Sequence, residues 1–444
     1  MSLSLSAPDR QLWRTAFAAE DVLLDEAARA YVLQDFSWYS PLLSAQLQNV
    51  SVDVIVFPRS LDQLEFAISA AVRLGSPITL RGAGTGNYGQ SVPVHGGILV
   101  DMRHYAGVTA LSATTATVRA GTRIAVAEET IREQGRELHL MPTSYRKSQT
   151  AGFVAGGAGG LGSITYGMLW DRNVVSAEVL TIEATPRRIH IGPDDIDVLI
   201  HTYGTVAAMA DIELPVAPAR SWVELGVAFA SFEHAAAFCW AFGRMTHIPK
   251  RLLSMESAPI PSFFPVRHLY APGDSIALLV VEDGRQAEVQ AIAEAHAGRV
   301  FAWPRTPEIS QFAFAHSPLW AKHADPSLSW IQLQWSTDEQ EFGRQVAAVK
   351  RRIGEKDIYL GFTFTRRGGT TLSVGSVGLL PRATAASIEA AMGVCRSEGV
   401  FVKNPHTYVL EDGGQVNNID RIVAWKRRLD PHNLLNPGKL RSAA

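Results

Sequence analysis

Two glycine-rich segments constrain this chain more than any other feature. The first covers residues 81–91 (Arg-Gly-Ala-Gly-Thr-Gly-Asn-Tyr-Gly-Gln-Ser) and the second covers residues 150–162 (Thr-Ala-Gly-Phe-Val-Ala-Gly-Gly-Ala-Gly-Gly-Leu-Gly). Glycine loses more conformational freedom on folding than any other residue, so dense glycine inside a domain needs a reason. One reason is that bare backbone N–H groups can surround a large anion such as a diphosphate. Two such segments predict a long ligand that is held at more than one point.

Composition narrows the class of protein. A chain of 444 residues predicts two or three domains. Lys+Arg 41 against Asp+Glu 43 gives a net charge of −2, which argues against a nucleic-acid partner or a membrane surface. The cysteines Cys239 and Cys395 show no metal-like spacing, and no signal peptide or long apolar run is present. We therefore expect a cytoplasmic protein with no membrane span and no metal site.

The first half of the chain alternates strands and helices. Ser60 begins a helix, with Gln63 in the position of a capping box, and Gly75 ends it. Short apolar runs at 54–57 and 78–80 predict strands, and the second of them leads directly into the first glycine segment. The pattern predicts an α/β arrangement up to Pro215 and Pro218, where we place a domain boundary.

From about residue 220 the sequence pattern changes. Strand-like runs alternate with amphipathic helices, which predicts an α+β domain with a largely antiparallel sheet. The expected strands are 223–230, 276–281, 329–335, 358–365 and 371–377, and the expected helices are 233–245, 285–297, 338–353 and 383–397.

Two common nucleotide-binding motifs do not fit the glycine segments. A Walker A motif needs Gly-Lys-Ser/Thr after its glycines, and neither segment has it. A Rossmann fingerprint needs a third glycine that opens a long helix, whereas a strand follows the first segment here.

Together with their flanks, the segments resemble the vanillyl-alcohol-oxidase/PCMH family of FAD-dependent oxidoreductases. The resemblance covers residues 53–215 and the last twenty residues, in the family's order. It is carried by 56–60 (Val-Phe-Pro-Arg-Ser), 81–86, 97–102 (Gly-Ile-Leu-Val-Asp-Met), 150–157, Tyr166-Gly167 with Asp171 and Val174, Gly204-Thr205, Asp430-Pro431 and 435–440 (Leu-Asn-Pro-Gly-Lys-Leu).

The resemblance implies an α+β fold, with a two-subdomain PCMH-type FAD-binding domain and a cap domain for the substrate. The expected units are residues 1–215 for FAD, 216–400 for the cap and 401–444 for a segment that returns to the FAD domain. FAD would be bound by Arg81, Gly82, Ala83, Gly84, Thr85, Gly86, Thr150, Gly152, Gly156, Gly157, Gly162, Ser163, Tyr166, Thr205 and Asn436.

Attachment of the flavin is expected to be non-covalent. Some family members tether it through a histidine in the first segment, where this chain has Thr85, and others add a cysteine before the second segment, where residues 139–144 have none. If a histidine elsewhere tethers the flavin, His406 is the first candidate.

Oxidation of an alcohol needs a base for the hydroxyl proton, and a substrate carboxylate would need an arginine fork. His406 is the expected base, and Tyr408 shares its face if the segment is extended. Arg366, beside Arg367 after the strand at 358–365, is the expected partner of a carboxylate. His316 and His323 are second choices for the base. The family's His-x-x-Gly-Asp-Gly-Asn-x-His metal segment does not occur here.

The resemblance implies an FAD-dependent oxidase or dehydrogenase that oxidises the CH–OH group of a small alcohol or 2-hydroxy acid by hydride transfer to flavin N5. The C-terminal residues 430–439 are nearest to glycolate-oxidase-like subunits. An oxidase of an aromatic alcohol or phenol, an NADPH-using reductase and a nucleotide-binding protein without redox activity remain alternatives. The electron acceptor would be dioxygen or another carrier.

Overall fold

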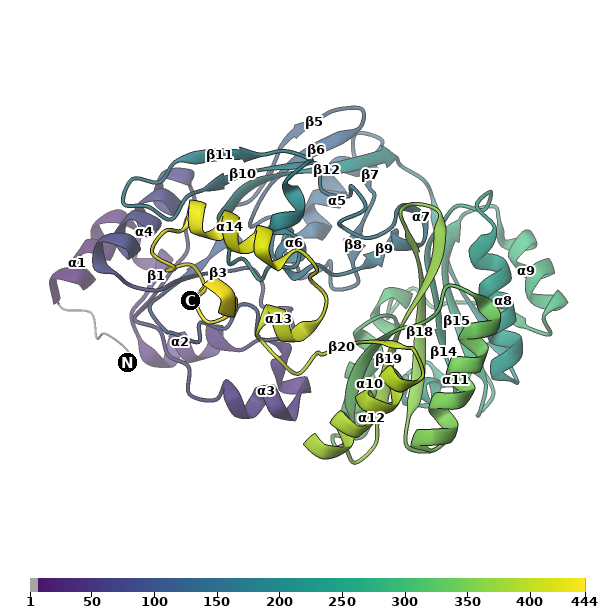
Figure 1. Cartoon of the computed structure of the whole chain (residues 1–444). Helices are drawn as coiled ribbons and strands as arrows, with labels where there is room; N and C mark the ends of the chain where they lie inside the picture. The colour runs from purple at the N-terminus through teal and green to yellow at the C-terminus, as the bar shows by residue number, and fades with distance from the viewer. Residues whose placement is uncertain (1–6, 444) are drawn as a thin grey trace.

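The computed structural model describes residues 7–443 as a mixed helix and strand structure with two main regions (Figure 1). The first region holds three sheets, and the second is built on one large sheet. The helices are α1 (Ala7–Ala16), α2 (Glu26–Leu33), α3 (Pro41–Gln46), α4 (Leu61–Leu74), α5 (Ile124–Arg132), α6 (Thr150–Gly156), α7 (Ser163–Tyr166), α8 (Phe232–Arg244), α9 (Gln286–Ala295), α10 (His316–Ala324), α11 (Glu339–Ile353), α12 (Ala385–Ser397), α13 (Leu410–Gly413) and α14 (Ile419–Leu429).

A four-stranded sheet positions the first glycine segment. Its order is β1 (Val22–Leu23), β2 (Val54–Val56), β4 (Ile98–Asp101), β3 (Ile78–Arg81). Strands β2, β4 and β3 are parallel, and their apolar residues are buried except for the partly buried Leu80. The segment follows the carboxyl end of β3.

The helix expected after Ser60 is confirmed in its capping. The Ser60 hydroxyl accepts from the Gln63 N–H at 3.3 Å, and the Gln63 side chain accepts from the Arg59 N–H at 2.8 Å. Gly75 ends α4 in the left-handed region at φ 60°.

A six-stranded sheet and a two-stranded sheet complete the first region. The six-stranded path is β11 (Arg188–Ile191), β10 (Ser176–Leu180), β12 (Ala208–Pro218), β6 (Thr115–Arg119) and β5 (Val108–Leu111), with β7 (Arg136–Leu138) paired to β12. The two-stranded sheet pairs β8 (Met141–Pro142) with β9 (Gly160–Leu161).

An eight-stranded antiparallel sheet forms the second region, as the strand pattern predicted. Its order is β16 (Arg299–Ala302), β13 (Trp222–Phe229), β15 (Ser275–Glu282), β14 (Lys250–Glu256), β18 (Tyr359–Arg367), β19 (Thr371–Leu380), β17 (Ser329–Gln334), β20 (Phe401–Lys403). Sequence reasoning missed β14, β16 and β20. Leu360, Phe362 and Phe364 of β18 pack with residues of α8, α11 and α12, so the alternate residues of β18 face the first region.

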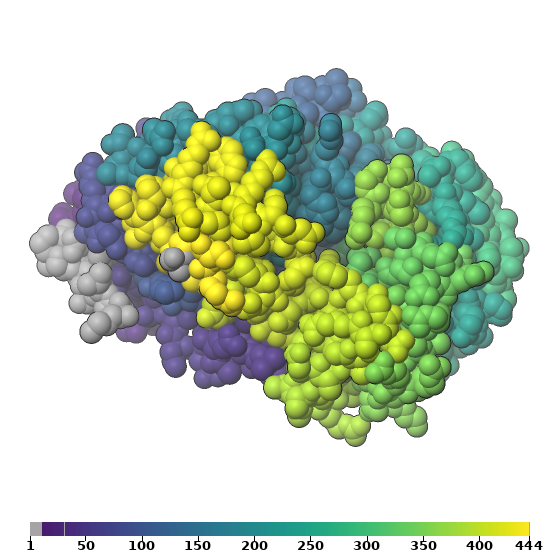
Figure 2. Space-filling view, in the orientation of Figure 1, coloured from purple at the N-terminus to yellow at the C-terminus, as the bar shows by residue number. Residues whose placement is uncertain are grey.

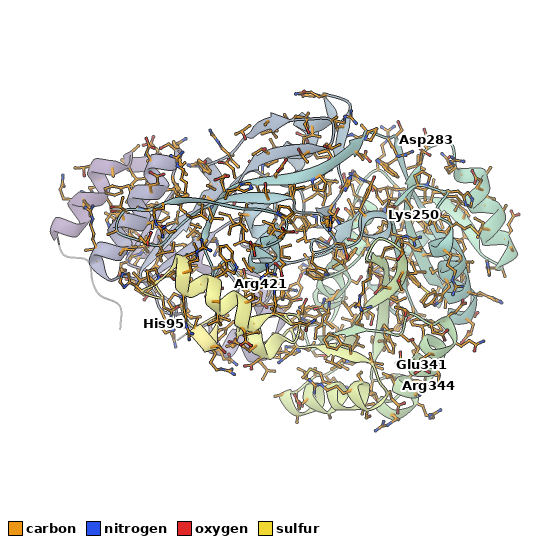
Figure 3. The ribbon with its side chains drawn as sticks, turned by 45° about the horizontal axis from the view of Figure 1, so that its top comes forward. His95, Lys250, Asp283, Glu341, Arg344 and Arg421 are labelled. Atoms are coloured by element: carbon orange, nitrogen blue, oxygen red, sulfur yellow. The ribbon has the colours of Figure 1, made fainter. Side chains whose placement is uncertain are left out.

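The C-terminal segment joins both regions. In Figure 2 it runs from the second region across the surface of the first. The Ile78 N–H donates to the Leu434 carbonyl and the Asn436 N–H donates to the Ile78 carbonyl, so the segment extends the four-stranded sheet by one bridge. Arg421, labelled in Figure 3, belongs to α14 and binds Asp195 and Asp197 of the first region.

A buried ion pair shapes the turn before the final residues. The Lys426 Nζ lies 2.6 Å from Asp430 Oδ2, and both side chains are buried. Asp430 also accepts from the N–H groups of Leu434 and Leu435. The carboxylate therefore fixes the turn that delivers Leu435 to the sheet.

The expected units 1–215, 216–400 and 401–444 remain a prediction. The strands of the first region end at Pro218, whereas β20 at 401–403 belongs to the eight-stranded sheet. Within residues 7–443 no helix has the length and apolar character needed to span a membrane.

Candidate active site

One cavity of about 330 Å³ lies between the two regions. Residues of both glycine segments line it, together with the loop after Ile200 and one face of the eight-stranded sheet. The two segments, far apart in the sequence, therefore face one shared space, as the hypothesis of a single long ligand requires.

The first wall of the cavity is the segment from Arg81 to Gly86. Gly84 has a φ of +64°, and a Cβ there would lie 2.1 Å from Arg81 Nη2, so this position needs glycine. Arg81 is buried and donates from Nη2 to the Gln34 carbonyl at 2.6 Å. Its Nε and Nη1 are buried and have no hydrogen-bond partner among the described residues. A buried guanidinium with two unused donors is costly unless an anion accepts from them.

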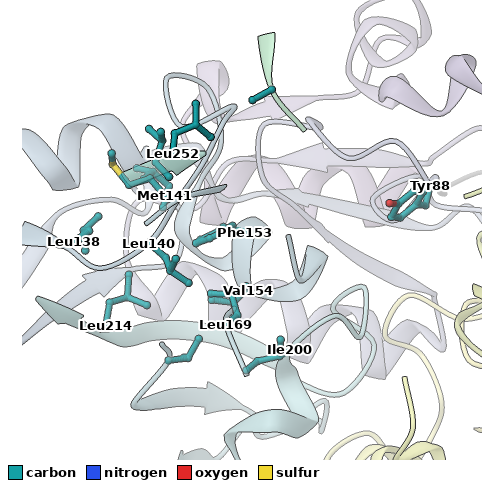
Figure 4. Close-up of a cluster of buried hydrophobic side chains, with 14 of the residues drawn as sticks. Tyr88, Leu138, Leu140, Met141, Phe153, Val154, Leu169, Ile200, Leu214 and Leu252 are labelled. Carbon is teal, nitrogen blue, oxygen red and sulfur yellow. The ribbon is translucent and has the colours of Figure 1, made fainter. Parts of the chain in front are cut away.

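Helix α6 forms the second wall and has two different faces. Phe153 and Val154 are buried in the core beneath it (Figure 4). Gly152 and Gly156 line the cavity, and they lie four residues apart on one helical face. A Cβ at Gly156 would contact nothing within 4 Å. The absence of side chains here leaves room in the cavity rather than avoiding a clash within the protein.

The loop at residues 201–203 closes the end of α6. His201 N–H donates to the Val154 carbonyl at 3.1 Å, and Tyr203 N–H donates to the Ala155 carbonyl at 3.0 Å. His201 and Tyr203 have φ values of 56° and 55°, which non-glycine residues adopt at some cost. The loop satisfies carbonyls that the helix end leaves free, and it holds His201 at the cavity.

His201 is a buried histidine with one free nitrogen. Its Nδ1 lies 2.6 Å from the Gly156 carbonyl, which can only accept, so Nδ1 carries the proton. Burial lowers the pKa of His201 to about 4, with Lys403 contributing in the same direction. The ring is therefore neutral at physiological pH, and Nε2, which has no hydrogen-bond partner among the described residues, holds a lone pair.

The third wall is a polar face of the eight-stranded sheet. Because side chains alternate along a strand, Thr363 and Thr365 of β18 line the cavity while their neighbours pack on the helices. Gln332 of β17 accepts from the Tyr88 hydroxyl at 2.7 Å. This bond ties the first glycine segment to the sheet across the cavity.

Two cations on this wall have no acidic partner among residues 7–443. Lys403 lines the cavity at the end of β20, and Arg367 lines it at the end of β18. Burial and, to a smaller extent, the charge of Arg367 lower the pKa of Lys403 to about 8. A pair of unneutralised cations in a cavity favours an anionic ligand.

The residues predicted from the sequence fall into two groups. Those that line the cavity are Arg81, Gly82, Ala83, Gly84, Thr85, Gly86, Gly152, Gly156, Gly157 and Arg366. Those outside its lining are Thr150, Gly162, Ser163, Tyr166, Thr205, Asn436, His406 and Tyr408.

Three members of the second group make defined contacts near the walls. Asn436 donates to the carbonyls of Gln90 and Tyr203, which joins the first segment to the loop at 201–203. Thr205 donates to the Thr202 carbonyl at 2.7 Å, and the Tyr166 ring stacks on His139 at 3.9 Å.

The expected base His406 is engaged elsewhere. Its Nδ1 lies 2.7 Å from Ser40 Oγ and its Nε2 lies 2.8 Å from the Trp330 carbonyl, so both nitrogens are used. Tyr408 lies against Lys439, whose Nζ is 4.8 Å from the ring centre. The structure therefore directs neither side chain to the cavity.

Arg366 reaches the cavity but its donors are occupied. The guanidinium donates to the carbonyls of Ile164, Thr370 and Gly243 at 3.1, 2.8 and 2.9 Å. The expectation that one arginine of the pair faces the ligand is better matched by Arg367.

Sequence reasoning missed His201, Lys403, Tyr88 and Glu256, which all line the cavity. His201 stands three residues before Gly204, a position that the family resemblance did include, so proximity to that motif was the available signal. No group of three or more His, Cys, Asp or Glu residues suited to a metal ion occurs among residues 7–443.

Comparison with known proteins defines the class. Residues 52–189 match the family model described as "FAD binding domain". The chain is 23% identical over 419 residues to glycolate oxidase subunit GlcD of Escherichia coli K12, which covers 87% of this chain and 83% of that protein. It is 24% identical over 170 residues to an uncharacterized FAD-linked oxidoreductase of Mycobacterium tuberculosis, covering 36% of this chain and 37% of that protein.

Solved structures show the same fold. Alkyldihydroxyacetonephosphate synthase matches with a TM-score of 0.75 and 15% identity, over 98% of this chain and 87% of that chain. 6-Hydroxy-D-nicotine oxidase from Arthrobacter nicotinovorans matches with a TM-score of 0.62 and 14% identity, over 93% of this chain and 96% of that chain.

This chain therefore carries a PCMH-type FAD-binding domain, and its cofactor is FAD. It is an FAD-linked oxidoreductase, a flavoprotein with a second α+β region over the cofactor domain.

The cavity walls fit this cofactor. A diphosphate needs donors, and Arg81 has two buried N–H groups without partners. Gly152 and Gly156 leave open space for a flat or extended group along α6. Gln149 also lines the cavity, and its Oε1 is a buried acceptor without a partner among the described residues. A long ligand with both anionic and hydrogen-bonding parts satisfies these atoms.

Proposed function

We propose that this enzyme oxidises a CH–OH group of a small alcohol or 2-hydroxy acid. The observation that carries the proposal is the pairing, within one cavity, of a neutral histidine nitrogen with two unneutralised cations. A base and an anion-binding group are what oxidation of a hydroxy acid requires beside the cofactor.

The cofactor would be held by the glycine walls. The Arg81 guanidinium and the backbone of residues 82–86 would bind the diphosphate, and the bare face of α6 would lie along the rest of the molecule. Bound FAD would supply the acceptor for the hydride of the substrate C–H bond, which carries both electrons of the oxidation. We expect non-covalent attachment, because Thr85 is engaged with Ser148 Oγ at 2.9 Å and stands where a tethering histidine would be.

His201 would take the proton of the substrate hydroxyl at Nε2. The Gly156 carbonyl fixes the tautomer and the ring orientation, so the lone pair is ready before the substrate arrives. In the resulting imidazolium both nitrogens donate, and the Nδ1 bond to the carbonyl is strengthened by the charge.

Lys403 and Arg367 would hold the substrate carboxylate. Burial and the neighbouring charge of Arg367 both lower the pKa of Lys403, and a bound carboxylate would offset the repulsion between the two cations. A charge-assisted hydrogen bond of this kind contributes about 1.5–3 kcal/mol.

A second candidate function is oxidation of an aromatic alcohol or phenol. Tyr88 and Trp330 line the cavity and their rings are nearly parallel, with centroids 6.3 Å apart and planes 16° apart. Such a wall accommodates a flat apolar ring.

A substrate panel distinguishes these functions. The purified yellow protein is mixed without oxygen with glycolate, D-lactate, L-lactate, vanillyl alcohol or NADPH, and loss of flavin absorbance is followed. Bleaching by a hydroxy acid supports the proposal, whereas bleaching by vanillyl alcohol alone or NADPH alone rejects it. Readmission of air then shows whether dioxygen reoxidises the flavin, and acid precipitation shows whether the flavin is released.

A further inference from the structure

Glu256 is a buried acid in the cavity that the proposed reaction does not use. It is 1% exposed, at the end of β14, and it lines the cavity together with Gly361. Its Oε2 has no hydrogen-bond partner among the described residues, and a Cβ on Gly361 would lie only 2.2 Å from that atom. Oε2 therefore lies directly over the bare backbone of Gly361, on the face of the sheet that forms the cavity wall.

Burial favours the neutral form of the Glu256 carboxyl group. Burial raises its pKa well above the ordinary value, and no cation lies within ion-pair distance among residues 7–443. Its Oε1 lies 2.7 Å from Ser317 Oγ, which also lies 2.9 Å from the Phe312 carbonyl. A neutral carboxyl offers one donor and one acceptor, so its free side suits an uncharged amide or hydroxyl rather than an anion.

The sheet register places Glu256 and Lys403 at opposite ends of one row. Glu256 pairs with Gly361, Gly361 with Val377, Val377 with Gln332, and Gln332 with Lys403. Residues directly opposite each other on neighbouring strands point to the same face. Four strand spacings separate the two ends, which is about 19 Å along the sheet.

We infer that Glu256 is a specificity-determining residue for the far end of an elongated substrate. The substrate class is a 2-hydroxy acid whose carboxylate lies at Lys403 and whose other end carries an uncharged hydrogen-bonding group, such as a primary amide, that pairs with Glu256. The inference rests on the proposed function, since it uses Lys403 as the anionic end. A two- or three-carbon acid cannot contact both ends of the row.

The test compares 2-hydroxy acids of equal chain length that end in a carboxamide or in a methyl group, with D-lactate as the short reference. For the native enzyme we expect kcat/KM to favour the carboxamide by about tenfold or more at the chain length that spans the row. Glu256→Leu removes this preference, because kcat/KM for the carboxamide then falls to that of the methyl-terminated acid. Glu256→Gln retains it, because an amide also donates and accepts.

Two further variants keep the test decisive. Gly361→Ala keeps the Glu256 residue but puts a methyl group 2.2 Å from the position of Oε2, so the carboxyl group must move away and the preference is lost even if Glu256→Leu does not fold. Glu224→Leu makes the same change as Glu256→Leu at a partly buried acid outside the cavity lining, and it leaves the preference intact.

The outcomes separate this inference from the proposed function. If D-lactate or another short acid bleaches the flavin but the native enzyme shows no preference for the carboxamide, the inference is wrong and the proposed function stands. If Glu256→Leu shifts the flavin absorption maxima while the preference persists, Glu256 contacts the cofactor instead and the inference is wrong. If no hydroxy acid of any length bleaches the flavin, both are wrong.

Discussion

The two main walls of the cavity are built by opposite means. The glycine wall consists of backbone from which side chains are missing, as at Gly152 and Gly156. The sheet wall consists of side chains brought together by strand register, as with Glu256, Gln332 and Lys403. The first wall suits a large cofactor that needs room and N–H donors, and the second suits a smaller ligand that needs individual polar partners.

Because the two walls are built differently, each can specify a different ligand. A bare backbone discriminates little between ligands of one shape, so the glycine wall defines a class of cofactor. Side chains at fixed positions discriminate between functional groups, so the sheet wall defines a substrate. Changes in the glycine wall should therefore alter cofactor content, and changes in the sheet wall should alter kcat or KM with the cofactor retained.

Substitution of His201 should have the largest effect, because His201 contributes a side chain to the glycine wall, which otherwise consists of backbone. His201→Asn removes the Nε2 lone pair but keeps an N–H that can donate to the Gly156 carbonyl, and asparagine tolerates the φ of 56° well. We expect kcat for the best hydroxy acid to fall by about 10²- to 10⁴-fold with the flavin retained. Single-turnover flavin reduction without oxygen measures this step.

Two further variants serve as controls for this result. His247→Asn changes a histidine whose side chain is 67% exposed and should leave the rate unaltered. If His406→Asn rather than His201→Asn abolishes flavin reduction in folded protein, the base is the residue that the sequence first suggested.

The glycine wall gives the next effect. Gly156→Val places a side chain in the space along α6, where nothing within 4 Å of the protein obstructs it. The apoprotein should fold normally, while FAD binding weakens by about tenfold to a hundredfold through overpacking. Flavin titration of the apoprotein, followed by fluorescence, measures the change.

Gly343→Val is the matched control, because Gly343 also lies in a helix with no atom within 4 Å of its Cβ position but is exposed on α11. Equal FAD affinity for Gly156→Val and the native protein would mean that the cofactor does not lie along α6.

The local features of the fold and the glycine wall could be predicted from the sequence. The capping of α4 by Ser60 and Gln63, and its end at Gly75, are local, and they were predictable from neighbouring residues alone. The binding role of the glycine segments could also be predicted, because a backbone without side chains appears directly in the sequence as clustered glycine. The resemblance to a known family then supplied the cofactor.

The sheet wall could not be predicted from the sequence. Lys403 and Glu256 are placed on the same row of the sheet only by four strand pairings between segments that lie far apart in the sequence. Sequence patterns do not fix strand order or register, and β14 and β20 were not recognised as strands at all. The role of His406 stays a prediction, and its surroundings in the sequence gave no sign that Ser40 and the Trp330 carbonyl would bind both of its ring nitrogens.

Substitution of Arg81 tests whether a side chain of the glycine wall contributes to FAD binding. Arg81→Met keeps most of the buried volume but removes the two unpartnered donors. One charge-assisted hydrogen bond contributes about 1.5–3 kcal/mol, so FAD affinity should fall by about ten- to a hundredfold. Isothermal titration of the apoprotein with FAD and with riboflavin separates the diphosphate from the ring system, because only FAD binding should weaken.

The control is Arg59→Met, which removes an arginine that is paired with Asp21 outside the cavity lining. A loss of riboflavin affinity equal to the loss of FAD affinity in Arg81→Met would show that Arg81 does not act on the diphosphate.

Lys403 gives the smallest effect and the sharpest test of the sheet wall. Its pKa of about 8 means that the ammonium is charged below this pH and neutral above it. Only the charged form attracts a carboxylate, so KM for a hydroxy acid should rise by about tenfold between pH 7 and pH 9. His201, with a pKa of about 4, stays neutral over this whole range, so it does not produce this break.

Lys403→Arg keeps a positive charge throughout, so the rise in KM should disappear from this pH range, while Lys403→Met should show a high KM that does not depend on pH. A neutral alcohol oxidised by the same enzyme carries no carboxylate, and its KM should stay flat in all three proteins. If the native enzyme and Lys403→Met give the same pH profile with the acid, then the cationic end of the row does not bind the substrate, and the sheet wall must recognise the substrate through its neutral groups alone.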